Sequence, residues 1–131
     1  MSRCQSLSFE NQCAATLTLD AAFSVHRILG PGLLKSVYEF CLAYELKRRG
    51  AEVQSQLVIP IIYEGVRLEG GLRIDLLVDH QLVVKIKAAE ALLPLYEAQL
   101  LTTLRLSRKR LGLLINFNVP VLRDGIRQII V

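Results

Sequence analysis

The chain has 131 residues, of which 52% are hydrophobic and 6% aromatic, and its 16 basic and 12 acidic residues give a net charge of +4. This length suits one domain with its own core, and no apolar run reaches the about 18 uncharged residues of a membrane-spanning helix, so we expect no membrane partner. Residues 1–15 lack the continuous apolar stretch of a secretory signal, which predicts a cytoplasmic protein with a single domain over residues 1–131.

Two helices are predicted at the start of the chain, after a poorly ordered N-terminus over residues 1–8. Residues 9–29 place apolar side chains at helical spacing and end at a Gly-Pro-Gly sequence. The helical pattern resumes over residues 33–49, where Lys-Arg-Arg in the last turn suits the helix dipole and Gly50 is placed as a C-terminal cap.

Three strands are predicted next, over residues 53–63, 66–78 and 81–88. These runs are rich in β-branched residues and are separated by turn residues, so we interpret them as an antiparallel meander. Pro60 cannot donate a hydrogen bond to a ladder, which predicts that the first strand lies at a sheet edge or contains a bulge.

A third helix over residues 94–106, opened by Pro94, is predicted to precede strands over residues 110–117 and 125–131. The order is therefore ααβββαββ. It predicts an α/β fold with a mixed central sheet flanked by helices, in which a helical crossover leads from the meander to a further strand and the first two helices pack on the sheet.

Charged residues stand in unusual places in the meander. Arg73 and Asp75 alternate with apolar residues in LRIDLLVD, and LVVKIKA carries Lys85 and Lys87 on one face, because residues two apart in a strand point the same way. A three-residue loop centred on His80 would put Asp75 opposite Lys85, whereas a two-residue loop would turn the lysines away. Spacing alone favours an ion-pair cluster on a solvated sheet face.

A further lysine lies on the apolar stripe of the second predicted helix. Lys35 shares this stripe with Tyr38 and Leu42, at i+3 and i+7. It also lies in the first helical turn, where the dipole disfavours a cation by roughly a few tenths of a kcal/mol or more. Lysines at both places, the start of a helix and a strand beside an Asp, suggest a site that was once occupied by a different group.

Five segments in succession complete a larger pattern: LGPGLLKSVYEFCLAYELKRRG, LRIDLLVD, LVVKIKAAEAL, YEAQLLTTLRL and RLGLLINFNVPVLRDGIRQII. Together, over about residues 10–131, they closely resemble the GxxExxY family of the PD-(D/E)xK, restriction-endonuclease-like superfamily. The resemblance implies a restriction-endonuclease-like core. In an intact member it implies hydrolysis of phosphodiester bonds with Mg²⁺ or Mn²⁺, where carboxylates hold the metal and a lysine positions the attacking water.

The resemblance assigns site positions residue by residue. Asp75 matches the family's metal-binding Asp, Lys87 its strand lysine and Gln99 the glutamine of its third helix. Lys35 stands where the GxxExxY frame has its Glu, and Lys85 stands where the Glu of the E-x-K strand falls. Three of the implied catalytic positions therefore keep the family's residue, and the other two have changed from carboxylate to ammonium.

These two lysines account for the whole net charge, since glutamates at both positions would leave 14 basic and 14 acidic residues. Each ammonium would repel Mg²⁺ by several kcal/mol at close approach, on the order of Coulomb's law at an effective dielectric of about 20. We therefore expect no cofactor in this chain, a vestigial metal position at Asp75, and an ion pair between Asp75 and at least one lysine. The lysines are explained either by a natural inactive paralogue or by deliberate exchange of glutamates.

Three functions are open. The first is a PD-(D/E)xK nuclease-family domain that is catalytically inactive because its metal-ligand positions are Lys35 and Lys85. The second is a non-catalytic protein that binds DNA or RNA through phosphate contacts of these lysines and Lys87. The third is a protein-interaction or assembly module that forms a homo-oligomer.

Overall fold

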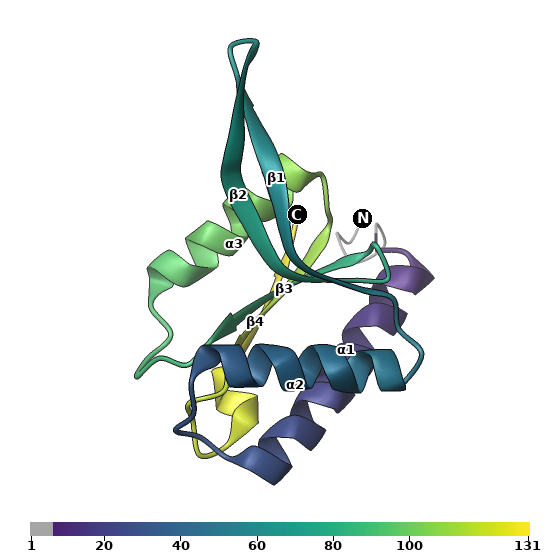
Figure 1. Ribbon diagram of the computed structural model, residues 1–131, viewed down its shortest axis with the longest axis vertical. Helices are drawn as coiled ribbons and strands as arrows, with labels where there is room; N and C mark the ends of the chain where they lie inside the picture. Colours follow the sequence, from purple (N-terminus) through teal and green to yellow (C-terminus); the bar gives the residue numbers. More distant parts are fainter. Residues whose placement is uncertain (1–6) are drawn as a thin grey trace.

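The computed structural model describes residues 7–131, so the predicted poorly ordered N-terminus lies outside the described residues except for Leu7 and Ser8. The elements follow the predicted order ααβββαββ with one addition, the short 3₁₀ helix η2 (Figure 1). In chain order they are α1 (Phe9–Leu29), α2 (Lys35–Arg48), β1 (Val53–Tyr63), β2 (Val66–Val78), β3 (Leu82–Lys87), α3 (Pro94–Ser107), β4 (Leu111–Asn116), η2 (Leu122–Gly125) and β5 (Ile126–Ile130).

The strands form one mixed sheet in the order β1-β2-β3-β4-β5. β1, β2 and β3 make the predicted antiparallel meander, and β4 runs parallel to β3 after the crossover through α3. β5 pairs antiparallel with β4 at the far edge. The fold is thus α/β with a mixed central sheet flanked by helices, and it fits the expected restriction-endonuclease-like core.

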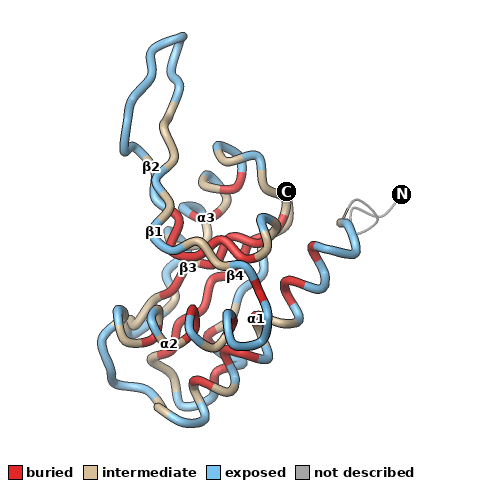
Figure 2. The backbone as a smooth tube through the Cα atoms, turned by 45° about the vertical axis from the view of Figure 1, so that its right-hand side comes forward, coloured by how far each residue is buried: buried red, intermediate tan, exposed pale blue. Residues whose placement is uncertain are grey.

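Buried side chains form one cluster on each face of the sheet. The α1–α2-side cluster includes Leu76, Val84 and Ile86 of the central strands, packed with α1 and α2. The α3-side cluster consists of Ile74, Leu77, Val83, Leu100, Leu104 and Leu114. Because helices cover both faces, β3 and β4 are the most buried strands (Figure 2).

Local sequence signals explain where the helices begin and end. The side chain of Ser8 accepts a hydrogen bond from the backbone N–H of Asn11 and caps the start of α1. At the end of α2, Gly50 has a φ of 94° and its N–H donates to the carbonyl of Lys47, while Ala51 donates to Leu46. This pair of bonds is a Schellman motif, so the predicted cap at Gly50 is confirmed.

Pro60 marks both features that the sequence predicted for the first strand. β1 lies at the edge of the sheet, and its register with β2 shifts between Ile59 and Ile61. Beyond this point the β1–β2 hairpin projects away from the rest of the molecule (Figure 1). Within residues 7–131, no helix has the length and apolar character that crossing a membrane requires.

Candidate functional site

The turn between β2 and β3 places Asp75 beside Lys85. Val78 pairs with Leu82 and Leu76 with Val84, so the turn is the three-residue loop centred on His80. The pairing ends at Leu76, and Asp75, one position beyond it, lies beside Lys85, whose Nζ reaches its carboxylate. The alternative of a two-residue loop, which would have turned the lysines away, is wrong.

β2 is irregular at Asp75. Ile74 packs in the α3-side cluster and Leu76 in the α1–α2-side cluster, although residues two apart in a regular strand share a face. Opposite this point, the β1–β2 ladder skips Gln56, whose φ is 53°. A positive φ is uncommon outside glycine and marks a local departure from the strand. Asp75 therefore lies just beyond the last β2–β3 pair, and its side chain reaches the backbone N–H of Ile86 in β3.

Three groups bind the carboxylate of Asp75, which is 1% exposed. Lys35 Nζ lies 3.2 Å and Lys85 Nζ 3.4 Å from Oδ1, and the backbone N–H of Ile86 donates to Oδ2 at 2.9 Å. The ion pair expected between Asp75 and at least one lysine is thus present with two. The interpretation as a cluster on a solvated face is wrong for the carboxylate, which is buried, whereas both lysine side chains remain partly exposed.

Lys35 is the first residue of α2. No residue of α2 itself or of its N-cap offsets the partial positive charge at the start of this helix. Leu34 at the N-cap offers no side-chain hydrogen bond, and the first turn contains no acidic residue. An ammonium here is disfavoured by the helix dipole, and Asp75 offsets this effect. The side chain of Lys35 is 41% exposed, so its ammonium also remains in contact with water.

Tyr38 fixes the loop between α1 and α2, which comes directly before Lys35. Its hydroxyl donates to the carbonyl of Gly30 at 2.6 Å and accepts from the N–H of Leu33 at 3.1 Å. Its ring is buried and stacks on Phe117, with the ring centroids 4.7 Å apart. Tyr38 therefore has a structural role, because its contacts fix the position at which α2 begins.

Lys87 lies on the same face of β3 as Lys85 but against the aromatic ring of Tyr96 in α3. Its Nζ is 4.2 Å from the ring centroid, a cation–π contact. Burial lowers the pKa of Lys87, the ammonium groups of Lys85 and Lys35 lower it further, and the Asp75 carboxylate opposes these effects. Sequence analysis did not single out Tyr96, whose only signal is its place in the first turn of the helix after Lys87.

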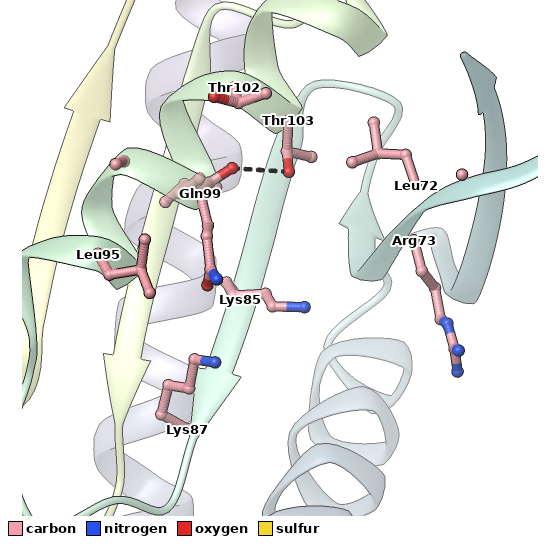
Figure 3. A pocket seen from close by; sticks show the side chains of 11 residues that line it. Leu72, Arg73, Lys85, Lys87, Leu95, Gln99, Thr102 and Thr103 are labelled. Carbon is pink, nitrogen blue, oxygen red and sulfur yellow. Dashed lines mark hydrogen bonds between the residues drawn. The ribbon is translucent and has the colours of Figure 1, made fainter.

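A cavity of about 480 Å³ opens beside the two β3 lysines (Figure 3). Lys85, Lys87 and Gln99 line it together with Arg73, two threonines of α3 and apolar residues of β2 and α3. The side chain of Gln99 points toward Lys85. Lys35 and Asp75 are not part of its lining. The four charged positions therefore form one cluster, but of these four only the two β3 lysines line the cavity.

Asn116 fixes the chain just after Lys87. Its side-chain oxygen accepts from the N–H of Ala89 at 3.0 Å, and its amide nitrogen donates to the carbonyl of Ala89 at 2.9 Å. The N–H of Phe117 donates to the carbonyl of Lys87 at 3.0 Å. These bonds tie the segment after β3 to the end of β4. A buried asparagine at the end of an apolar strand is the signal that could have revealed this role.

The side chains present do not fit a divalent metal ion. Mg²⁺ and Mn²⁺ need several oxygen ligands, most of them anionic. Across residues 7–131, no group of three or more His, Cys, Asp and Glu side chains is arranged to hold a metal. At Asp75, the positions of further ligands are taken by two ammonium nitrogens. Three lysines around one carboxylate instead give the cluster an excess of positive charge, which suits an anion.

A family model described as the PD-(D/E)XK nuclease superfamily matches residues 12–129. The match includes every charged residue of the site described above, together with the five strands apart from the last residue of β5. Comparison with curated proteins and with solved structures gives no match to either.

Proposed function

This chain belongs to the PD-(D/E)XK nuclease superfamily, and we propose that it is a catalytically silent domain of that superfamily. In this domain, lysine nitrogen has taken the place of the metal ion. The sequence resembles the GxxExxY family within that superfamily, with Lys35 and Lys85 at its two glutamate positions. One observation carries the proposal: both ammonium groups lie within 3.4 Å of the same oxygen of Asp75.

The physical argument is one of competition for Asp75. A divalent metal in an intact member supplies a Lewis acid and a water of lowered pKa. An ammonium about 4 Å from such an ion would repel it by about 4 kcal/mol for each unit of metal charge at an effective dielectric of about 20. The same ammonium groups already neutralise Asp75, so the fold needs no ion at this point.

We expect the chain to leave single- and double-stranded DNA and RNA intact in the presence of Mg²⁺ or Mn²⁺, because residues 7–131 provide no carboxylate cluster to hold the metal that would activate a water molecule. A gel assay with end-labelled substrates measures this directly. The Asp75→Ala variant, purified in parallel, identifies any contaminating nuclease, since contaminating cleavage would be equal in both preparations. Cleavage by the chain that is lost in Asp75→Ala would overturn the proposal.

A second candidate function, non-catalytic binding of nucleic acid, is favoured by the charge of the cavity. Lys85 and Lys87 line it, and no carboxylate is among its lining residues. Phosphate groups are the abundant anions that such a surface recognises, and they would compensate the excess positive charge of the cluster. A cytoplasmic location, where DNA and RNA are accessible, belongs to the same proposal.

For this second function we expect an affinity for DNA or RNA that falls steeply with salt, and a marked loss in Lys85→Glu. The slope of log affinity against log salt should decrease by about one for each lost phosphate contact. Fluorescence anisotropy at several salt concentrations measures both quantities. Lys47→Glu makes the same charge change at an exposed position in the last turn of α2 and is the matched control. Equal losses in the two variants would argue for charge alone, against a site.

A further inference from the structure

The cavity beside β3 presents hydrogen-bond donors that have no acceptor within the described part of the chain. Lys87 Nζ lies over the ring of Tyr96 and makes no hydrogen bond or ion pair to any described residue. Lys85 donates one of its three N–H groups to Asp75, so the other two are available. The side-chain amide of Gln99 is likewise not bonded to another described residue. In Figure 3, Gln99 and the two lysines extend into the same space from α3 and β3.

The positive charge of the cluster is larger than one singly charged anion compensates. Lys35, Lys85 and Lys87 carry three positive charges and Asp75 carries one negative charge, so two positive charges are left. A phosphodiester group carries one negative charge, whereas a phosphate monoester carries about 1.5 to 2 negative charges at pH 7. The balance of charge therefore favours a monoester over a diester.

The cavity also has an apolar side. Leu72 of β2 and Leu95 of α3 line it, and Leu95 is 60% exposed. Among the described residues, the other charged side chain of the lining is Arg73, which donates to Gln56 at 3.1 Å. Figure 3 shows that its guanidinium points away from Lys85. The volume of about 480 Å³ lies within the range of roughly 300–1,000 Å³ for small-molecule sites, in which a few polar groups fix a ligand against apolar walls.

We propose that the cavity binds a phosphate monoester, with Lys85, Lys87 and Gln99 donating to the phosphate oxygens and the organic part resting on the apolar side. Such a phosphate occurs on a free nucleotide or phosphorylated metabolite, and also at the end of a nucleic acid. The inference rests on the proposed replacement of metal by lysine nitrogen, because an intact acidic cluster would leave no excess of positive charge. Where the ligand is a nucleic acid, its terminal phosphate is bound in preference to its backbone.

Two probes that differ by one methyl group test the proposal. Adenosine 5′-monophosphate and its phosphate methyl ester share the base and the sugar, but the ester carries a single negative charge. Calorimetric titrations are done with EDTA at a pH of about 7.5, above the second phosphate pKa of about 6. We expect the monophosphate to bind about tenfold or more tightly than the ester, because its extra charge strengthens the hydrogen bonds from the ammonium groups. Equal affinities, or no binding of the monophosphate at millimolar concentration, would overturn the proposal.

Variants of the lining locate the binding. Lys87→Gln should weaken binding of the monophosphate about tenfold or more. Gln99→Ala changes an exposed position of α3, which makes it a second variant with little risk to the fold, and it should weaken binding severalfold. Lys47→Gln removes the same charge as Lys87→Gln from an exposed position in the last turn of α2 and is the matched control. Equal losses in Lys47→Gln and Lys87→Gln would contradict binding in the cavity.

Oligonucleotides with and without a 5′-phosphate distinguish the two sources of the group. Tighter binding of the phosphorylated oligonucleotide than of the monophosphate would identify the end of a nucleic acid, and weaker binding would identify a free ligand. Equal binding of both oligonucleotides, tighter than that of the monophosphate, would show recognition of the backbone and would overturn the proposal. Binding of the monophosphate only when Mn²⁺ replaces EDTA would contradict the proposed function itself, whereas metal-independent binding without preference for the monoester would contradict this inference alone.

Discussion

Replacing Asp75 with alanine should lower the free energy of unfolding by about 2–4 kcal/mol, somewhat less than the roughly 3–5 kcal/mol for breaking a fully buried ion pair. The change removes the acceptor of the buried N–H of Ile86 and leaves Lys35 and Lys85 close together without a counter-charge. The side chains of the two lysines are 41% and 26% exposed, so solvent relieves part of their repulsion. Most of the loss therefore comes from the unpaired backbone N–H.

Urea unfolding of three variants separates these contributions. Asp75→Asn keeps an oxygen that can accept from Ile86 while it removes the charge, so its stability should lie between those of the parent and Asp75→Ala. Asp20→Ala changes an exposed carboxylate of α1 and should stay within about 0.5 kcal/mol of the parent. Equal stability of Asp75→Ala and the parent would mean that Asp75 does not hold the site together.

The double change Lys35→Glu with Lys85→Glu should make the stability of the protein depend on metal. Without metal, two new carboxylates beside Asp75 repel each other and it, and the melting temperature should fall below that of the parent. Mn²⁺ or Mg²⁺ should then raise it, because a ligand bound only by the folded state stabilises that state by about 2.7 kcal/mol at a hundred times its dissociation constant. The parent should melt at the same temperature with and without the metal.

The same double variant also tests the ancestral activity. If its carboxylates restore an acidic cluster, it should cleave nucleic acid with Mg²⁺ or Mn²⁺, and adding Asp75→Ala should abolish the cleavage. Melting and cleavage are separate readouts, so a variant that binds metal without turnover still reports on the site. A melting temperature that does not respond to either metal would show that positions 35, 75 and 85 do not form a metal site.

Local signals explain why most of the fold could be predicted from the sequence. The predicted bounds of the first helix, 9–29, and of the first two strands, 53–63 and 66–78, coincide with those of α1, β1 and β2. Each is delimited by residues with strong local preferences, such as the glycines after α1 and α2. The turn at His80 could also be predicted from the sequence, but its length could not, since loops of two and three residues were both open. The length of this loop decides whether Asp75 lies beside Lys85.

The burial of Asp75 could not be predicted in this way. The alternation in LRIDLLVD indicates a strand with one solvated face, yet Ile74 through Val78 are all buried. Their burial depends on where α2 and α3 dock, which is set by parts of the chain far from β2. The contact of Lys87 with Tyr96 likewise depends on the docking of α3. Lys35 and Asp75 are 40 positions apart in the sequence, and their proximity was predicted from the family resemblance rather than from residue spacing.

A calorimetric titration of the unaltered chain with Mn²⁺ tests the replacement of metal by lysine nitrogen most directly. We expect no binding in the sub-millimolar range, with heats equal to those of the Asp75→Ala variant, because Lys35 and Lys85 occupy the carboxylate that a metal would need. Sub-millimolar binding by the unaltered chain that disappears in Asp75→Ala would contradict the proposal and would restore Asp75 as a working metal ligand.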